Sequence, residues 1–179
     1  MCLAMSFDGF IEGPSGEIDW IVFGEESGSA LTEFTREIDT VLYGRVSYEM
    51  WGNPPITENS SEFERTFYGK LARMDRYVFS TTKTEFEGNA EVVKDGIAEL
   101  VAGLKSKPGK HIWLYGGASL ITTFMNLDLV DEYRLAIMPT IIGKGKPLFT
   151  DVENRHRLKL INANPSKSGV LEITYEAIR

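Results

Sequence analysis

Two glycine turns, each directly after an apolar run, carry the clearest chemical signal in this sequence. Gly44-Arg45 follows residues 40–43, and Gly116-Gly117 follows residues 112–115. Each run is typical of a buried strand, and glycine lets the backbone turn tightly. Each following segment has helical periodicity, so its first free N–H groups would face an anion. Glycine also ends strands for steric reasons alone, but two such turns in one small domain favour nucleotide binding.

Metal and disulfide chemistry have little support in the sequence. The single cysteine, Cys2, excludes an intramolecular disulfide and a cysteine cluster for metal, and it is expected to be a small core residue. His111 and His156 have no carboxylate partner at ligand spacing. We therefore expect structural or solvent-facing roles for both histidines and no metal site.

Composition and charge favour a soluble domain with a small-molecule partner. The 179 residues are 42% hydrophobic and 25% charged, which suits a single globular domain over residues 1–179 with a sizeable core. The formal net charge of −7 argues against a nucleic-acid surface. The apolar runs are too short to span a membrane and no basic leader precedes Ser6, so the sequence predicts a cytoplasmic protein.

The elements that must position the glycine turns follow from hydrophobic periodicity. The first strand is expected at 2–7, followed by a glycine-punctuated loop at 8–16. Further strands are expected at 40–43, 76–80, 91–94, 111–115 and 132–138, and helices at 29–38, 45–51, 62–73, 97–104 and 118–126. Ser60 or Ser61 can cap the helix at 62–73, and Asp95 the helix at 97–104. This alternation favours parallel pairing with helices on both faces of the sheet. The last strands, 158–161 and 171–178, most simply form an antiparallel hairpin at one edge.

Four short motifs occur in a characteristic order and spacing. They are AMSFDGFI at 4–11, GRVSYE at 44–49, GGASL at 116–120 and GKGKPLF at 143–149. Together they resemble the dihydrofolate reductase-like superfamily, most closely the reductase domain of riboflavin biosynthesis and its stand-alone relatives. The resemblance covers nearly the whole chain. It implies an α/β three-layer fold with a mainly parallel central sheet, a C-terminal antiparallel hairpin and helices on both faces, and it implies a reduced nicotinamide cofactor.

Carried over to this sequence, the resemblance implies an NADPH site. A guanidinium suits phosphate because its fixed fork donates two hydrogen bonds at once, and hydroxyls with a lysine favour NADP over NAD. The implied residues are Gly44, Arg45, Val46 and Ser47 at the adenosine-side phosphates, Ser80, Thr81, Thr82 and Lys83 around the adenine and ribose 2′-phosphate, Gly116, Gly117, Ala118, Ser119, Leu120 and Ile121 at the pyrophosphate, and Ala4 and Ile11 beside the nicotinamide. Without the resemblance, these residues also suit a surface ion pair, a capped turn, close packing and core positions, respectively.

The proton source is the part of the site that departs from the family pattern. Dihydrofolate reductases place a carboxylate at the start of the helix expected at 29–38, but the matching position is close to Ala30, which argues against folate as substrate. Riboflavin-pathway reductases usually carry a glutamate just before the glycine pair, where this chain has Tyr115. Asp8 and Asp19 are the candidate substrate-side carboxylates. Asp8 before Gly9 equally suits a turn.

Aromatic residues offer a surface for a planar substrate. Trp20 and Trp51 lie next to the motifs and are the candidates for substrate stacking, whereas Phe63, Phe67 and Tyr68 more often fill core.

The leading hypothesis is an NADPH-dependent oxidoreductase that resembles 5-amino-6-(5-phosphoribosylamino)uracil reductase and transfers hydride to a small heterocyclic or related unsaturated substrate. The alternatives are a non-catalytic nucleotide-binding or scaffolding protein of the same fold, a true dihydrofolate reductase, and a flavin or purine-nucleotide binder. By family analogy a homodimer is expected, with edge strands of the C-terminal region pairing between chains.

Overall fold

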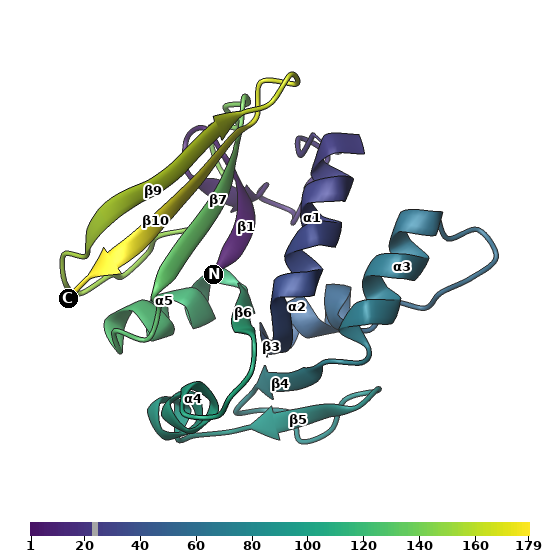
Figure 1. Ribbon diagram of the computed structural model, residues 1–179, viewed down its shortest axis with the longest axis vertical. Helices are drawn as coiled ribbons and strands as arrows, with labels where there is room; N and C mark the ends of the chain where they lie inside the picture. The colour runs from purple at the N-terminus through teal and green to yellow at the C-terminus, as the bar shows by residue number, and fades with distance from the viewer. Residues whose placement is uncertain (23–24) are drawn as a thin grey trace. The chain divides into compact units, whose positions relative to one another are not determined.

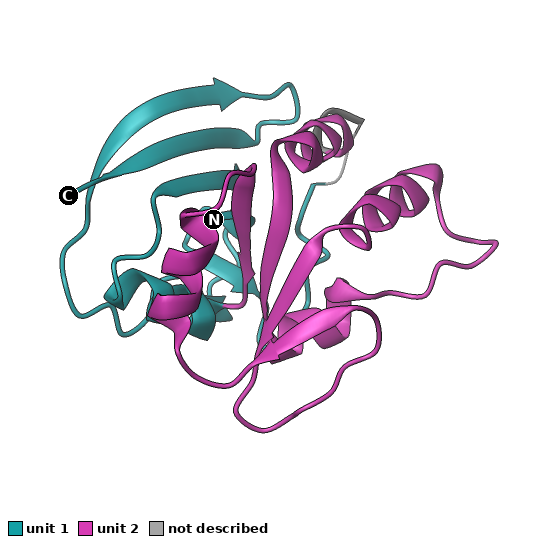
Figure 2. Ribbon diagram, turned by 60° about the horizontal axis from the view of Figure 1, so that its bottom comes forward, with its two compact units in different colours: residues 1–24, 118–179 teal, residues 25–117 magenta. Residues whose placement is uncertain are grey.

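The computed structural model describes residues 1–22 and 25–179 (Figure 1). The chain divides into two compact units, which Figure 2 shows in different colours. Unit 1 combines residues 1–24 with residues 118–179, and unit 2 is the continuous segment 25–117.

Unit 2 contains a parallel sheet with the strand order β5-β4-β3-β6. Its strands are β3 (Ile38–Gly44), β4 (Asp75–Phe79), β5 (Ala90–Val93) and β6 (His111–Gly116). The central strand β3 is the most buried, with Val41, Leu42 and Tyr43 at most 1% exposed. A strand covered on both faces needs an uninterrupted apolar run rather than an alternating one, which explains residues 40–43.

Helices cover both faces of the unit 2 sheet. They are α1 (Glu25–Glu37), the short α2 (Arg45–Ser47) that continues into the π-helical turn η1 (Tyr48–Gly52), α3 (Glu62–Leu71) and α4 (Ile97–Lys105). The connection through α3 moves from β3 outward to β4, whereas the connection through α4 returns from β5 to β6. Right-handed crossovers in opposite directions place α3 and α4 on opposite faces.

The start of α3 is a capping box on Ser61, one of the two serines that the sequence predicts as its N-cap. The Ser61 hydroxyl accepts the N–H of Glu64 at 3.1 Å, and the Glu64 carboxylate accepts the N–H of Ser61 at 2.7 Å. The expected cap at Asp95 is wrong. Gly96, with φ at +67°, is the N-cap of α4, and no side chain caps this helix. Glycine adopts this left-handed conformation without the penalty that a Cβ would bring.

Unit 1 contains a mixed sheet with the strand order β1-β7-β10-β9. β1 (Cys2–Ser6) is parallel to β7 (Glu132–Met138), and β10 (Leu171–Ile178) is antiparallel to both β7 and β9 (Arg157–Pro165). The expected C-terminal hairpin at a sheet edge is therefore confirmed. In helix α5 (Ala118–Asn126), Ile121 is fully buried and Phe124 is 2% exposed.

A short ladder in unit 1 joins the segment predicted as a loop, residues 8–16, to the motif at 143–149. β2 (Phe10–Glu12) pairs with β8 (Lys146–Pro147) in an antiparallel arrangement. Gly145 lies so close to this ladder that a Cβ on it would overlap the carbonyl oxygen of Glu12. Close packing of two backbones therefore explains this glycine of the 143–149 motif.

The α/β class and the parallel pairing are confirmed. Hydrogen bonding distributes the described strands among three sheets, two of four strands and one of two, where the sequence predicts one central sheet. Within residues 1–22 and 25–179, no helix is both long enough and apolar enough to cross a membrane.

Candidate functional site

Both glycine turns lie at the carboxyl edge of the unit 2 sheet. Gly44 ends β3 and Gly116 ends β6, and these parallel strands are direct neighbours, with Tyr43 opposite Gly116. From β3 the chain moves outward through β4 and β5 and then returns to β6 on the other side of β3. The ends of β3 and β6 therefore flank a topological switch point, which is where open α/β sheets bind ligands.

The two turns approach each other through bare backbone. A Cβ on Gly44 would lie 3.3 Å from the carbonyl oxygen of Gly116 and 3.4 Å from the amide nitrogen of Gly117. Gly44 has φ at −72°, so the close approach rather than its own conformation favours glycine there. Gly116 has φ at +110°, and the Gly116-Gly117 peptide is cis. The predicted glycine pair and Gly44 thus belong to one backbone surface without side chains.

Two cations at the same edge share a single carboxylate. Arg45 Nη1 donates to Glu49 Oε2 at 2.8 Å, and Lys83 Nζ donates to Glu49 Oε1 at 2.9 Å. Lys83 Nζ also lies 5.0 Å from the centre of the Phe86 ring, within cation–π range. We refer to Arg45, Glu49 and Lys83 as the charge cluster. Glu49 was not among the predicted site residues, although its position four residues after Arg45 on a helical segment is a signal for such a pair.

The charge cluster is accessible to solvent, and its cations favour the ionised form of Glu49. The side chains of Arg45, Glu49 and Lys83 are 42%, 33% and 52% exposed. The hydrogen bond from Lys83 lowers the pKa of Glu49, and the positive charges of Lys83 and Arg45 add to this against the opposing effect of desolvation. Glu49 is therefore a carboxylate at neutral pH, and the cluster carries one net positive charge.

Ser80 shapes the turn that presents Lys83. Its buried hydroxyl accepts the N–H of Thr82 at 3.3 Å and the N–H of Lys83 at 3.0 Å. Phe79, the last residue of β4, is paired with Gly44, so this turn adjoins the end of β3. Ser80 serves the turn itself, whereas Thr81, Thr82 and Lys83 are exposed.

The predicted cofactor residues fall into both units. Unit 2 brings ten of them to one sheet edge: Gly44, Arg45, Val46, Ser47, Ser80, Thr81, Thr82, Lys83, Gly116 and Gly117. Unit 1 contains Ala4 in β1 and Ile11 in β2, both half-buried, and the first turn of α5. In that turn Ala118, Leu120 and Ile121 are buried and Ser119 is exposed, so their contribution to a ligand would come from backbone N–H groups.

Asp8 uses both carboxylate oxygens to hold backbone in unit 1. Oδ1 accepts the Ser6 hydroxyl at 2.7 Å and the Ile142 N–H at 3.2 Å, and Oδ2 accepts the Gly143 N–H at 2.7 Å. Desolvation opposes ionisation, but the hydrogen bonds from Ser6, Gly143 and Ile142 outweigh it and lower the pKa of Asp8. Gly9 has φ at +91°, so the turn-forming arrangement that the Asp-Gly pair suggests is present.

The other predicted substrate-side residues are more open. Asp19 is exposed, and its carboxylate has no hydrogen-bond partner among the described residues. Trp20 is half-buried and its Nε1 donates to the Glu17 carbonyl at 3.0 Å. Trp51 is half-buried in η1 of unit 2.

Unit 2 also has an aromatic cluster that includes two rings not predicted for the site, Phe34 and Trp113. The Trp113 ring lies 4.8 Å from Tyr115, 5.1 Å from Phe34 and 6.3 Å from Phe67, and Phe67 stacks on Phe63 at 5.4 Å. Trp113 and Phe67 are buried, while Phe34, Phe63 and Tyr115 are half-buried. The alternation of Trp113 and Tyr115 along β6 places both on one face and is the signal that could have identified them.

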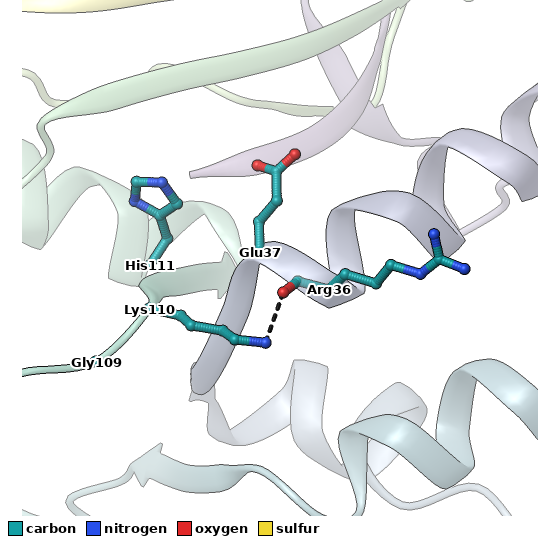
Figure 3. Close-up of a pocket in the computed structure, with 5 residues that line it drawn as sticks. All are labelled: Arg36, Glu37, Gly109, Lys110 and His111. Atoms are coloured by element: carbon teal, nitrogen blue, oxygen red, sulfur yellow. Dashed lines mark hydrogen bonds between the residues drawn. The ribbon is translucent and has the colours of Figure 1, made fainter.

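A hollow of about 390 Å³ lies at the opposite, amino end of β3 and β6 (Figure 3). Its lining residues are Arg36, Glu37, Gly109, Lys110 and His111. Lys110 Nζ donates to the Arg36 carbonyl at 2.7 Å, and the Lys110 N–H donates to Asp39 Oδ2 at 2.7 Å. These bonds tie Lys110, just before β6, to the end of α1 and the start of β3, so the hollow is part of a structural junction.

The Cys2 thiol and possible clusters of metal ligands were the remaining candidates for chemistry. Burial raises the pKa of the Cys2 thiol to about 11, which keeps it protonated and unreactive. Across the described residues, no three His, Cys, Asp or Glu side chains are grouped as metal ligands.

Comparison with known proteins gives a consistent result. Residues 1–171 match the RibD C-terminal domain family. The uncharacterized protein YyaP of Bacillus subtilis is 47% identical over 173 residues, covering 97% of this chain and 91% of that protein. A putative riboflavin biosynthesis protein from Shewanella sp. PV-4 superposes with a TM-score of 0.77 at 24% identity, covering 99% of this chain and 97% of that one. Dihydrofolate reductase from Enterococcus faecalis, in complex with NADP(H), superposes with a TM-score of 0.67 at 14% identity, covering 98% and 94%.

Proposed function

Because the chain belongs to the RibD C-terminal domain family and has the dihydrofolate reductase-like fold, we propose that it is an NADPH-dependent reductase of a small heterocyclic or related unsaturated substrate. One observation carries the cofactor assignment: bare glycine backbone and two exposed cations lie together at the carboxyl edge of one parallel sheet. A pyrophosphate needs bare backbone that it can approach closely, and a 2′-phosphate needs the cations.

The described residues of unit 2 fit such a dinucleotide. Gly44 and the Gly116-Gly117 pair bring backbone without side chains together at this sheet edge, and Arg45 and Lys83 offer charged donors at the same edge. Bound reduced nicotinamide supplies a hydride, and the protein supplies binding and orientation. In unit 1, Ala4 and Ile11 remain predictions for the nicotinamide contact, as do the backbone N–H groups of residues 118–121 for the pyrophosphate.

The substrate proposal rests on the aromatic cluster and on the relatives. Half-buried Phe34, Phe63 and Tyr115 suit a flat heterocycle, and the Shewanella relative carries a riboflavin-biosynthesis name, which favours a pyrimidine-like ring. Tyr115 stands where riboflavin-pathway reductases carry glutamate, and burial raises the pKa of this phenol. A neutral donor in place of a carboxylate favours a substrate different from 5-amino-6-(5-phosphoribosylamino)uracil.

For proton transfer we propose Asp19 ahead of Asp8. The Asp8 carboxylate is held by three hydrogen bonds that favour its ionised form, whereas Asp19 is exposed beside Trp20. Ala30, the residue near the position where dihydrofolate reductases carry a carboxylate, is exposed within α1 and provides none, which disfavours the dihydrofolate reductase alternative. Neither Asp8 nor Asp19 is arranged as a firmly held proton donor, and this favours the non-catalytic nucleotide-binding alternative.

The test is a titration of the purified protein with NADPH and with NADH, followed by nicotinamide fluorescence. We expect NADPH to bind more tightly than NADH, and Arg45→Ala to weaken NADPH binding about 10- to 100-fold, the range for loss of a charge-assisted hydrogen bond. Arg36→Ala is the matched control, since Arg36 forms a comparable exposed ion pair with Glu33 at 2.6 Å. Absence of binding by both nucleotides would refute the cofactor assignment. NADPH binding without turnover of any heterocycle would favour the non-catalytic alternative.

The proposal includes a cytoplasmic homodimer. Edge strand β9 is exposed at all nine residues, among them Leu158, Leu160 and Ile161, so an apolar strip is available to a second copy. A cytoplasmic location fits a chain with one cysteine and a cofactor that the cytoplasm keeps reduced.

A further inference from the structure

The charge cluster contains a carboxylate that a phosphate site does not require. Glu49 presents one oxygen to Arg45 Nη1 at 2.8 Å and the other to Lys83 Nζ at 2.9 Å. Two oxygens of a phosphate monoester would make the same pair of contacts. The carboxylate therefore occupies the position that an anionic ligand needs.

We propose that Glu49 is an internal competitor that controls how strongly this site holds a phosphate monoester. Under the proposed function, on which this inference rests, that monoester is the 2′-phosphate of the dinucleotide. Glu49 then sets the preference for NADPH over NADH by limiting the contribution of Arg45 and Lys83.

The order of charges along the helix argues that the pair does not exist to stabilise the helix. Arg45 precedes Glu49 by four residues, and this order is less favourable than glutamate before the basic residue because it opposes the helix dipole. The segment also comprises only α2 and η1, residues 45–52. A role toward the cations themselves explains the carboxylate better.

Exposure allows the competition to take place. Glu49 is one-third exposed and both cations more so, so water can replace either ion pair at small cost. A phosphate monoester carries between one and two negative charges near neutral pH, and it meets only one net positive charge while Glu49 stays ionised. Removing the carboxylate charge doubles that net charge and frees both donors.

The position of Lys83 does not depend on Glu49. Ser80 fixes the backbone at Lys83, and the Phe86 ring lies 5.0 Å from Lys83 Nζ, so neither feature depends on the carboxylate. The Glu49→Gln protein therefore keeps Lys83 near the end of β3. This separates competition from positioning, because a positioning residue would be needed for binding.

The experiment compares wild type with Glu49→Gln by calorimetric titration with adenosine 2′-monophosphate, NADPH and NADH. We expect adenosine 2′-monophosphate and NADPH to bind about 3- to 10-fold more tightly to the variant, the effect of removing one or two exposed ion pairs, with NADH unchanged. Glu91→Gln, an exposed carboxylate of β5 with the same change in net charge, should alter none of the three. Adding Lys83→Met to Glu49→Gln should reverse the gain.

Each outcome decides the question. Unchanged or weaker binding of both 2′-phosphorylated ligands by Glu49→Gln, with NADPH still bound, overturns the competitor role and leaves the reductase proposal intact. Tighter adenosine 2′-monophosphate binding without any NADPH binding supports the competitor role and refutes the cofactor assignment. No binding of any ligand to either protein refutes both.

Discussion

At Gly44 a single hydrogen atom in place of a methyl group decides how closely two strand ends can approach. Its backbone conformation is open to any residue, but an added Cβ would lie 3.3 Å from the Gly116 oxygen. That neighbour is backbone of a buried strand end and cannot move aside as a flexible side chain would. Glycine at this position therefore lets the two strand ends meet closely at the edge where the pyrophosphate is proposed to bind.

Gly44→Ala is therefore expected to lower the free energy of unfolding by about 1–3 kcal/mol, the usual cost of overpacking, and to weaken NADPH binding. Urea unfolding and fluorescence titration measure the two effects. The control is Gly69→Ala in α3, where nothing lies within 4 Å of the added Cβ, and where alanine should instead stabilise by about 0.5–1 kcal/mol. Unaltered affinity in Gly44→Ala would show that the ligand does not approach this turn.

Asp8 gives unit 1 a stability that depends on pH. Its folded pKa lies below the unfolded value of about 3.9, so the ionised carboxylate stabilises the folded state above pH 4, and this contribution is lost as the pH falls through the folded pKa. Asp8→Asn removes the charge but keeps the size. We expect the variant to be less stable than wild type at pH 5 to 7 and the difference to vanish in strong acid.

Hydrogen exchange at the Ile142 and Gly143 amides provides the local readout, since both donate to Asp8. Their exchange should accelerate in Asp8→Asn at neutral pH. A stability difference that stays constant between pH 7 and pH 2 would contradict this assignment.

At the scale of the elements, sequence patterns were sufficient wherever burial is strong or a breaker is present. The expected bounds of α5 and β7 agree with the structure at both ends. Gly117, Asp128 and Pro139 lie just outside strongly apolar segments and interrupt regular secondary structure there. β2 and β8 are three and two residues long, too short for any period to appear, and their pairing joins segments far apart in the sequence.

The candidate site was predictable in its backbone and less so in its charges. Glycines at strand ends can be read from the chain, and Arg45 follows one of them directly. Contact between Lys83 and Glu49 depends on the turn that the Ser80 hydroxyl folds, which no residue spacing reveals. The aromatic cluster likewise requires α1, α3 and β6 to meet in three dimensions.

The capping box of α3 allows a test of a local sequence rule, the preference for serine at a helix N-terminus. Ser61→Ala should lower the free energy of unfolding by about 1 kcal/mol, because the Glu64 N–H loses its acceptor and the Glu64 carboxylate loses the bond from the Ser61 hydroxyl at 2.8 Å, while the backbone N–H of residue 61 still donates to Glu64. Thr66→Ala, at an exposed position within the same helix, should be neutral or slightly stabilising. Thermal unfolding of both variants measures the difference, and equal effects would show that the cap contributes nothing.

At the scale of the whole molecule, a row of apolar side chains on one face of the unit 1 sheet extends from a buried position to an exposed one. Tyr133 of β7, Tyr175 of β10 and Leu160 of β9 form one cross-strand row. Along this row the side chains pass from 2% exposed at Tyr133, through half-buried at Tyr175, to 53% exposed at Leu160. A row that begins as core and ends in solvent is typical of a surface completed by a partner, and the edge position of β9 gives a second copy room to pair.

Leu160→Lys is accordingly expected to weaken dimerisation about 10-fold or more, since a charge at the centre of an apolar contact must be desolvated. The fold should be retained, with stability changed by less than about 0.5 kcal/mol, because the position is exposed within one chain. Asn162→Lys is the control. Asn162 is paired with Thr174 beyond the bulge and thus faces the opposite side of the sheet, so the same added charge should leave the dimer intact. Sedimentation velocity over a concentration series measures both. A wild-type chain that remains monomeric at the highest concentration would contradict the homodimer, and equal weakening by the two substitutions would place the contact along the strand edge rather than on the apolar face.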